Sequence, residues 1–353
     1  MLVVLTIPAL SLLFLQNRQV QTLLSKYVAE RLSEELMANI SLSSINYSFF
    51  KMVQIEDLYL EDLHGDTLIY SELTKIRLKQ LFRGRNGLEI RKITLENAGL
   101  NLVIDSSNVV NIKYFTDMLK KPHVPPERKN RLHIAKIEMK DGFFSLSNMV
   151  KKEKDGVNFT DFRLNELQID LNDLISELDT VRMDIISLAA IENSGFEISE
   201  LSTLMSIGKT HMHFDDLDIL TPVSDLEVPK MYFDFGHFRD FKRFSYKVDL
   251  DFESSQSSLK INDLALWVPE TRGMLDYIDI TGKAHGKLSD LKGDDLIMTF
   301  DQNSTLAFDF VMIGLPKFSS TFMEFNFREL NTSVYAMNAM IEEITDVSRG
   351  SLY

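Results

Sequence analysis

Two histidines and two aspartates lie close together in the sequence. His211 and His213 fall on one face of an expected strand, and Asp215 and Asp216 follow them. Imidazole and carboxylate groups are ligands that suit Zn²⁺, so these residues could supply half of a metal site. No complete ligand set can be placed around them, and the simpler interpretation is a polar strand face.

Other residues that carry catalysis are absent or wrongly spaced. Gly208-Lys209-Thr210 resembles the end of a phosphate-binding loop, but Thr203 stands where that loop needs a glycine. The sequence has no G-x-S-x-G, G-x-G-x-x-G or H-E-x-x-H motif. It also has no cysteine, which excludes disulfides and thiolate catalysis. We therefore expect no enzymatic activity, no cofactor and no metal.

The composition is that of a folded, acidic protein. Of 353 residues, 44% are hydrophobic and 25% are charged, and the formal net charge is −14. A polyanionic backbone is repelled by such a charge, so nucleic acid is not an expected partner. The same charge gives no general attraction to anionic lipid headgroups.

Strict alternation of apolar and polar residues predicts that most elements are strands with one apolar face. The clearest run is 244–252, in which Phe244, Tyr246, Val248, Leu250 and Phe252 alternate with polar residues. The same period returns in 231–235, 306–312 and 323–327.

A second spacing recurs, in which two mostly polar residues separate the first two of three apolar ones. The doubled polar pair breaks the alternation by one residue, as a β-bulge does. Asn97-Ala-Gly99 and Asp141-Gly142, which follow two copies, predict hairpin turns. The copies cover 55–60, 73–78, 90–95, 134–139, 164–169, 214–219, 261–266 and 275–280.

The start of the chain differs from the rest. Residues 1–16 are almost entirely apolar and read as a membrane anchor that is incomplete at its start, with Leu2, Leu5, Leu10, Leu13 and Phe14 facing lipid. Residues 17–39 predict an amphipathic helix that lies on a membrane surface or caps the end of a sheet; its apolar stripe comprises Val20, Leu23, Leu24, Tyr27, Val28, Leu32 and Leu36.

The remaining residues, 40–353, predict one continuous β-structure. A short helix is expected at 109–121, and the proline-containing segment 122–131 predicts a hinge. Alternation alone leaves open whether the apolar faces line an open groove or pack against each other in a closed core.

The order of elements resembles the N-terminal part of the AsmA-like and TamB family, particularly its Bacteroidetes-type members. In that family a strand with an L-x-L-x-D element runs into G-D-T-L, and here Leu58-Tyr-Leu60-Glu-Asp-Leu-His-Gly65-Asp66-Thr67-Leu68 follows the anchor and the helix. Further similar stretches are Gly195–Ser202, Ile280–Lys292, Gly314–Pro316, Thr321–Met323 and Glu329–Ser333.

The resemblance implies a chorein-like fold: a mainly β protein whose long, twisted antiparallel sheet curls into an open trough, behind an N-terminal membrane helix and an amphipathic helix. It also implies a bacterial inner-membrane protein with a single span and its bulk in the periplasm. Family members are usually several times longer, and their C-terminal region contacts an outer-membrane barrel protein. This chain stops before such a region, so we expect a fragment.

Two functions follow as expectations. The first is intermembrane transport of phospholipid, whose acyl chains the apolar groove would shield. The second is a structural scaffold for outer-membrane assembly that pairs its edge strand with a barrel partner. A secreted adhesin-like β-solenoid is a weaker alternative. The candidate lipid-facing residues are Ile55, Leu58, Leu60, Ile93, Leu95, Leu100, Leu102, Ile137, Met139, Phe244, Tyr246, Val248, Leu250, Phe252, Phe308 and Phe310.

Overall fold

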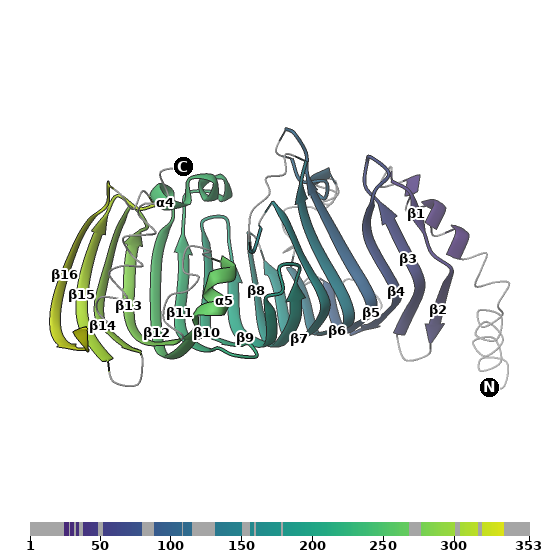
Figure 1. Ribbon diagram of the computed structural model, residues 1–353. Coiled ribbons are helices and arrows are strands. Elements are labelled where there is room, and N and C mark those ends of the chain that lie inside the picture. The colour runs from purple at the N-terminus through teal and green to yellow at the C-terminus, as the bar shows by residue number, and fades with distance from the viewer. Residues whose placement is uncertain are drawn as a thin grey trace, which may run out of the picture. The chain divides into compact units, whose positions relative to one another are not determined.

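The computed structural model is built mainly from strands (Figure 1). It describes residues 25–27, 29–31, 33–34, 38–48, 52–79, 88–107, 109–114, 131–149, 156–158, 160–177, 179–267, 277–300, 304–316 and 320–334. The expected anchor residues at 1–16 and nearly all of the expected hinge at 122–131 lie outside these ranges. Within them, no helix is both long enough and apolar enough to cross a membrane.

The strands form one open, mixed sheet of 16 strands. From β3 to β16 the order in the sheet is the order in the sequence, and β1 and β2 both pair with β3. Contacts divide the chain into two units: a first unit of residues 1–154, 158–178 and 189–195, and a second unit of residues 155–157, 179–188 and 196–353. The division falls within β8 (Thr180–Glu192).

The first unit holds the early strands. They are β1 (Ile40–Ser41), β2 (Ser44–Ser48), β3 (Met52–Glu61), β4 (Thr67–Leu78), β5 (Leu88–Ile104), β6 (Arg131–Asn148) and β7 (Asp161–Glu177).

The described residues of the second unit form the later strands and three short helices. The strands are β9 (Glu197–Ile207), β10 (His211–Leu220), β11 (Asp225–Asp234), β12 (Asp249–Lys260), β13 (Tyr277–Lys287), β14 (Asp290–Phe300), β15 (Ser304–Ile313) and β16 (Phe322–Asn331). The helices are η1 (Phe238–Arg243), α4 (Phe244–Lys247) and α5 (Ile261–Trp267).

The expectation of a purely antiparallel sheet was wrong at one place. β5 and β6 run parallel, with Leu88 beside Leu132 and Ile104 beside Asn148. Parallel neighbours need a crossover that returns the chain to the starting end of the sheet, and residues 105–130 make that connection. Of the helix expected at 109–121, only residues 109–114 are described, and of these 113 and 114 are helical.

The two predicted hairpins are also wrong. β5 runs straight through Asn97-Ala-Gly99, and β6 runs straight through Asp141-Gly142. Asn97 and Asp141 do adopt left-handed backbone angles, with φ of 47° and 52°, but each does so as a single residue inside a strand. Gly99 serves close packing and not a turn, because a Cβ there would lie 2.0 Å from the Phe143 ring.

The bulge prediction is confirmed for the copies at 164–169 and 214–219, where Glu166 and Asp216 have φ of 51° and 47° and the register shifts. In the copy at 55–60, Asp57 has φ of 51°, yet Glu56 and Leu58 stay in register with β4. The copy at 261–266 forms α5 instead of a strand.

The predicted amphipathic helix is described only in part. Residues 25–27, 29–31, 33 and 34 are helical. Tyr27, which was assigned to the apolar stripe, is 65% exposed, whereas Ser25 and Ala29 are buried. The helix is joined to β1, because the Ser33 hydroxyl accepts a hydrogen bond from the Ile40 backbone N–H (3.0 Å).

Candidate functional site: the apolar face of the sheet

The register of the first unit brings apolar residues from separate strands into rows. Ile55 pairs with Thr74, Thr74 with Leu95, and Leu95 lies beside Met139. Because residues directly opposite each other in a sheet point to the same side, these side chains share one face. We call this side the apolar face and the opposite side the polar face.

The apolar face continues past the left-handed residues. Leu58 pairs with Ser71, and the Ser71 hydroxyl accepts a hydrogen bond from the Thr74 hydroxyl (2.9 Å). Thr74 is the partner of Ile55, so Leu58 and Ile55 lie on the same side. The left-handed Asp57 between them therefore restores the face that strict alternation would have reversed.

The structure brings together all nine candidates of the first unit on this face. Each is partly buried, and none is fully buried or fully exposed. Leu60, Leu100 and Leu102 pack against the buried Leu68 cluster. The other six belong to neither cluster of buried side chains in the described residues: Ile55, Leu58, Ile93, Leu95, Ile137 and Met139.

The second unit has an equivalent face. One row runs from Phe214 through Met231 and Phe252 to Ala284, and Leu250 belongs to the next row. Leu250 and Phe252 are partly buried. Both candidates of β12 therefore lie on the predicted face.

The candidates of β15 lie at the far end of this face. Phe308 is 6% exposed and belongs to a buried cluster with Leu296, Phe300 and Leu306. Phe310 lies over Gly293, where a Cβ would meet its ring at 2.2 Å. Phe308 thus packs in a core, whereas Phe310 remains partly exposed.

The predicted strand at 244–252 is wrong in its first half. Residues Phe244–Lys247 form α4, and β12 begins at Asp249. Val248 is fully buried, and Tyr246 is 55% exposed, so neither lines the apolar face as an accessible wall. Phe244 does reach that face, but as a cover: its ring centroid lies 6.0 Å from that of Phe233, and Phe233 pairs with Leu250.

An aromatic cluster explains why the chain turns helical here. Phe235, Phe238, Phe241 and Phe244 recur every third residue, which is the period of a 3₁₀-helix. These four rings and the ring of Phe233 form one cluster, in which the centroids of contacting rings lie 4.9 to 6.5 Å apart. The sequence interpretation missed this three-residue period, because alternation in the neighbouring segment dominated it.

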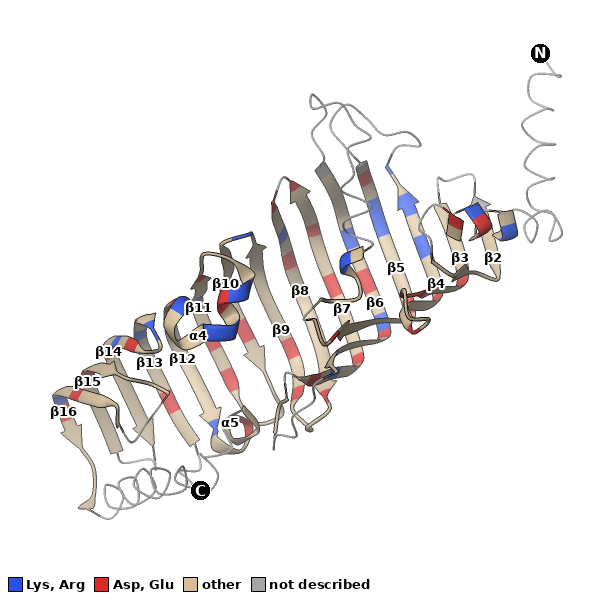
Figure 2. Cartoon of the chain, turned by 90° about the horizontal axis from the view of Figure 1, so that it is seen from above, with Lys and Arg blue, Asp and Glu red and all other residues tan. Residues whose placement is uncertain are grey.

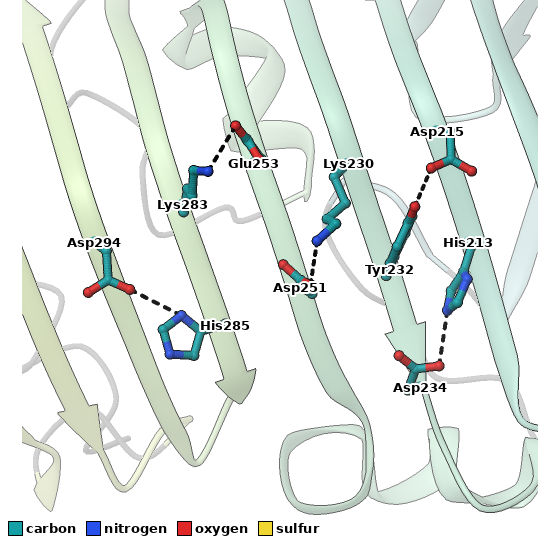
Figure 3. Close-up of polar contacts among 10 residues, drawn as sticks. All are labelled: His213, Asp215, Lys230, Tyr232, Asp234, Asp251, Glu253, Lys283, His285 and Asp294. Atoms are coloured by element: carbon teal, nitrogen blue, oxygen red, sulfur yellow. Dashed lines mark hydrogen bonds and ion pairs between the residues drawn. The ribbon is translucent and has the colours of Figure 1, made fainter.

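Ion pairs and hydrogen bonds between neighbouring strands cover the polar face (Figure 3). In the second unit, Nζ of Lys230 lies 2.7 Å from Asp251 and Nζ of Lys283 lies 3.2 Å from Glu253. The hydrogen bond to Asp251 raises the pKa of Lys230. In the first unit, the hydrogen bond from Lys92 lowers the pKa of Glu138. In these pairs, partly exposed lysines and carboxylates of the polar face neutralise each other.

His211 and His213, the histidines considered as metal ligands, lie side by side, with ring centroids 4.8 Å apart. His213 joins the polar network. His213 stacks on the Tyr232 ring, with centroids 4.0 Å apart, and its Nε2 lies 3.0 Å from Asp234. The Tyr232 hydroxyl donates a short hydrogen bond to Asp215, which raises the pKa of Tyr232 to about 12. No group of three or more metal-ligating side chains forms in the described part of the chain.

The loop after β3 carries the motif that resembles L-x-L-x-D and G-D-T-L. Asp62 is 5% exposed and accepts hydrogen bonds from the backbone N–H groups of His64 (2.8 Å) and Asp66 (3.1 Å), and from the Asn111 side chain (3.0 Å). Although burial raises the pKa of Asp62, these hydrogen bonds outweigh it and hold the pKa below its usual value. Asp62 therefore fastens this loop to the start of the β5–β6 crossover.

Comparison with known proteins assigns no family to this chain. No family model matches the sequence, and no curated protein matches it significantly.

Proposed function

We propose that this chain shields phospholipid acyl chains on the apolar face of its sheet and so supports lipid transport between bacterial membranes. In this proposal the chain is anchored in the inner membrane and its β-structure lies in the periplasm, where the sheet curls into an open trough. The resemblance to the AsmA-like and TamB family supports this assignment.

The observation that carries the proposal is the difference between the two faces. Ion pairs occupy the polar face, whereas six apolar candidates of the first unit join no buried cluster and remain partly exposed. The transfer of an acyl chain of roughly 16 carbons into water has an unfavourable free energy on the order of 12 kcal/mol. A continuous apolar strip offsets this cost without a specific binding pocket, so a lipid can move along it.

Neighbouring residues of β5 allow a matched test. A photocrosslinking amino acid at Leu95 should form phospholipid adducts in the full chain, as should one at Leu250. The same probe at Thr94, which pairs with Lys75 on the polar face, should form few. The fully buried Val248 supplies a second control. Equal adduct yields at Leu95 and Thr94, or none at Leu95 and Leu250, would refute the proposal.

A second candidate function rests on β16. This strand ends the sheet, and nine of its ten residues are exposed. An unpaired edge is a template for β-augmentation by another chain. Photoprobes at Asn326 that crosslink to an outer-membrane protein, with no lipid adducts at Leu95, would favour the scaffold function over lipid transport.

A further inference from the structure

The segment that covers one end of the apolar face in the second unit also carries a local excess of positive charge. It comprises η1 and α4, and we call its outward residues the basic-aromatic patch: Phe238, Arg239, Lys242, Arg243, Tyr246 and Lys247. Figure 2 shows blue segments gathered on this part of the ribbon. The rest of the chain must be more acidic than the net charge of −14 indicates.

The inward side of the segment fixes it on the sheet. Phe241 lies 4.9 Å from Phe235 and Phe244 lies 6.0 Å from Phe233, measured between ring centroids. The Ser289 backbone N–H also donates to the Ser245 carbonyl (2.8 Å). The outward side chains are therefore held in place before any partner arrives.

The acidic residue of the segment is turned inward. Asp240 accepts hydrogen bonds from the backbone N–H groups of Gly236 (2.9 Å) and His237 (3.0 Å), and its side chain is 14% exposed. Two acidic residues at the adjoining strand ends are also engaged: Asp234 pairs with His213, and Asp249 pairs with Lys287.

The cations of the patch differ from those of the polar face. All four are exposed, and none has an acidic partner within 4.0 Å among the described residues. Lys230 and Lys283, by contrast, are paired with carboxylates.

The aromatic residues of the patch point outward as well. Phe238 is 52% exposed although its ring stacks on Phe241, and Tyr246 is 55% exposed. Aromatic rings beside Lys and Arg are typical of segments that lie in a membrane interface, with the rings at the level of the headgroups and the cations near the phosphates.

We propose that the basic-aromatic patch docks the second unit onto the surface of an anionic bilayer. This goes beyond the shielding of acyl chains, because the patch contacts a membrane surface and not a lipid held on the sheet. The surface would meet the strand ends at which β12 begins, so a lipid leaving that bilayer would enter close to the apolar face.

A single environment-sensitive dye can test the docking in the full chain, which has no native cysteine. The dye is placed at Tyr246→Cys, or at Asn262→Cys in α5, which follows the opposite end of β12. Vesicles contain phosphatidylcholine alone or phosphatidylcholine with one third phosphatidylglycerol. The dye at 246 should shift to the blue only on the anionic vesicles and lose the shift in high salt, because salt screens exposed charges. The dye at 262 should not shift on either kind of vesicle.

Charge reversal supplies the matched comparison. Lys242→Glu with Arg243→Glu should weaken the apparent affinity of the dye-labelled site for anionic vesicles by roughly tenfold or more. Lys140→Glu with Lys292→Glu changes the net charge equally at exposed positions outside the patch and should change the affinity little. The conservative pair Lys242→Arg with Arg243→Lys should retain binding.

The proposal is overturned if the dye at 246 does not respond to anionic vesicles, as expected if the patch binds an acidic protein. It is also overturned if both charge-reversed variants lose binding equally. Because the dye reports its own surroundings, an N-terminal anchor that holds the chain on both kinds of vesicle does not mimic the result. Lipid adducts at Leu95 without a dye response would leave acyl-chain shielding intact while refuting docking.

Discussion

Single residues in left-handed conformation interrupt the alternation of side chains in six of the described strands. Seven non-glycine residues in the described strands have positive φ, and all are Asp, Asn or Glu. Short polar side chains tolerate this conformation better than branched apolar ones. At Glu166 and Asp216 the extra residue accompanies a register shift, so the polar residue keeps the following leucine on the apolar side.

Hydrogen bonding within the polar network predicts a pH-dependent contribution to stability. Tyr232→Phe removes the hydrogen bond to Asp215 and should lower the free energy of unfolding by about 1 kcal/mol near pH 8. Because the pKa of Tyr232 is raised to about 12 from an ordinary value of 10.0, its contribution is complete below pH 10 and fades as the pH rises towards 12.

Urea unfolding at pH 8 and pH 11 measures this contribution. The difference between wild type and Tyr232→Phe should be smaller at pH 11. Tyr246→Phe is the control, since its hydroxyl has no hydrogen-bond partner among the described residues. A difference that stays constant with pH would contradict the role of the Asp215 hydrogen bond.

At the scale of elements, the sequence predicted the strands better than it predicted where they end. The alternation in 231–235 correctly predicts a strand, because Met231 and Phe233 lie at the end of β11. Alternation also begins at Phe244, yet residues Phe244–Lys247 form α4, and the Phe244 ring packs on Phe233 over the end of the apolar face. Alternation is a local pattern, so it does not predict which residues will pack against a part of the sheet that is distant in the sequence.

Spacing was ambiguous in the same way. Ile261, Leu264 and Leu266 fit the bulged-strand spacing, whereas Ile261, Leu264 and Ala265 fit the spacing of a helix, i, i+3 and i+4. The segment forms α5. Asn97 and Asp141 carry turn chemistry that a bulge uses equally. The nine candidate residues of the first unit nevertheless share one face, because the left-handed residues between them keep the apolar side chains on the same side. That this face contacts lipid stays a prediction.

The edge strand β16 carries an aromatic surface of its own. Phe325 and Phe327 are 41% and 46% exposed and lie beside Phe308, at centroid distances of 5.8 and 5.5 Å. An exposed edge with an apolar face favours association with other strands. We expect Phe325→Ser with Phe327→Ser to reduce concentration-dependent aggregation, measured by light scattering.

Phe322→Ser provides the control for this prediction. Phe322 is 57% exposed but pairs with Ile313, on the side of the strand opposite Phe325. If that substitution reduces aggregation as much as the double variant, general hydrophobicity of the edge is responsible and the apolar face is not.

At the scale of the whole molecule, a perturbation should stay local. Gly99→Ala places a methyl group 2.0 Å from the Phe143 ring and should destabilise the packing of β5 on β6 by about 1–3 kcal/mol. Because the extensive contacts of the described strands are with their neighbours in the sheet, as in repeat proteins, hydrogen exchange should accelerate in β4 to β7 and not in β12 to β15.

Removing the ring tests the cause. Gly99→Ala should cost much less in a Phe143→Ala background, because the clash is absent there and the two sites are directly coupled. Equal costs in both backgrounds would show that the clash is not responsible. Faster exchange throughout the chain would show that the sheet unfolds as one cooperative unit.

The sequential order of the strands has a consequence for how such a chain can change length in evolution. A hairpin gained or lost between β7 and β16 leaves every other strand pointing in its original direction, so whole hairpins are free units of insertion. A single strand gained or lost would reverse all that follow, unless the chain crossed back over the sheet. Because β5 and β6 run parallel, the strand directions on the two sides of this pair are not linked by simple alternation.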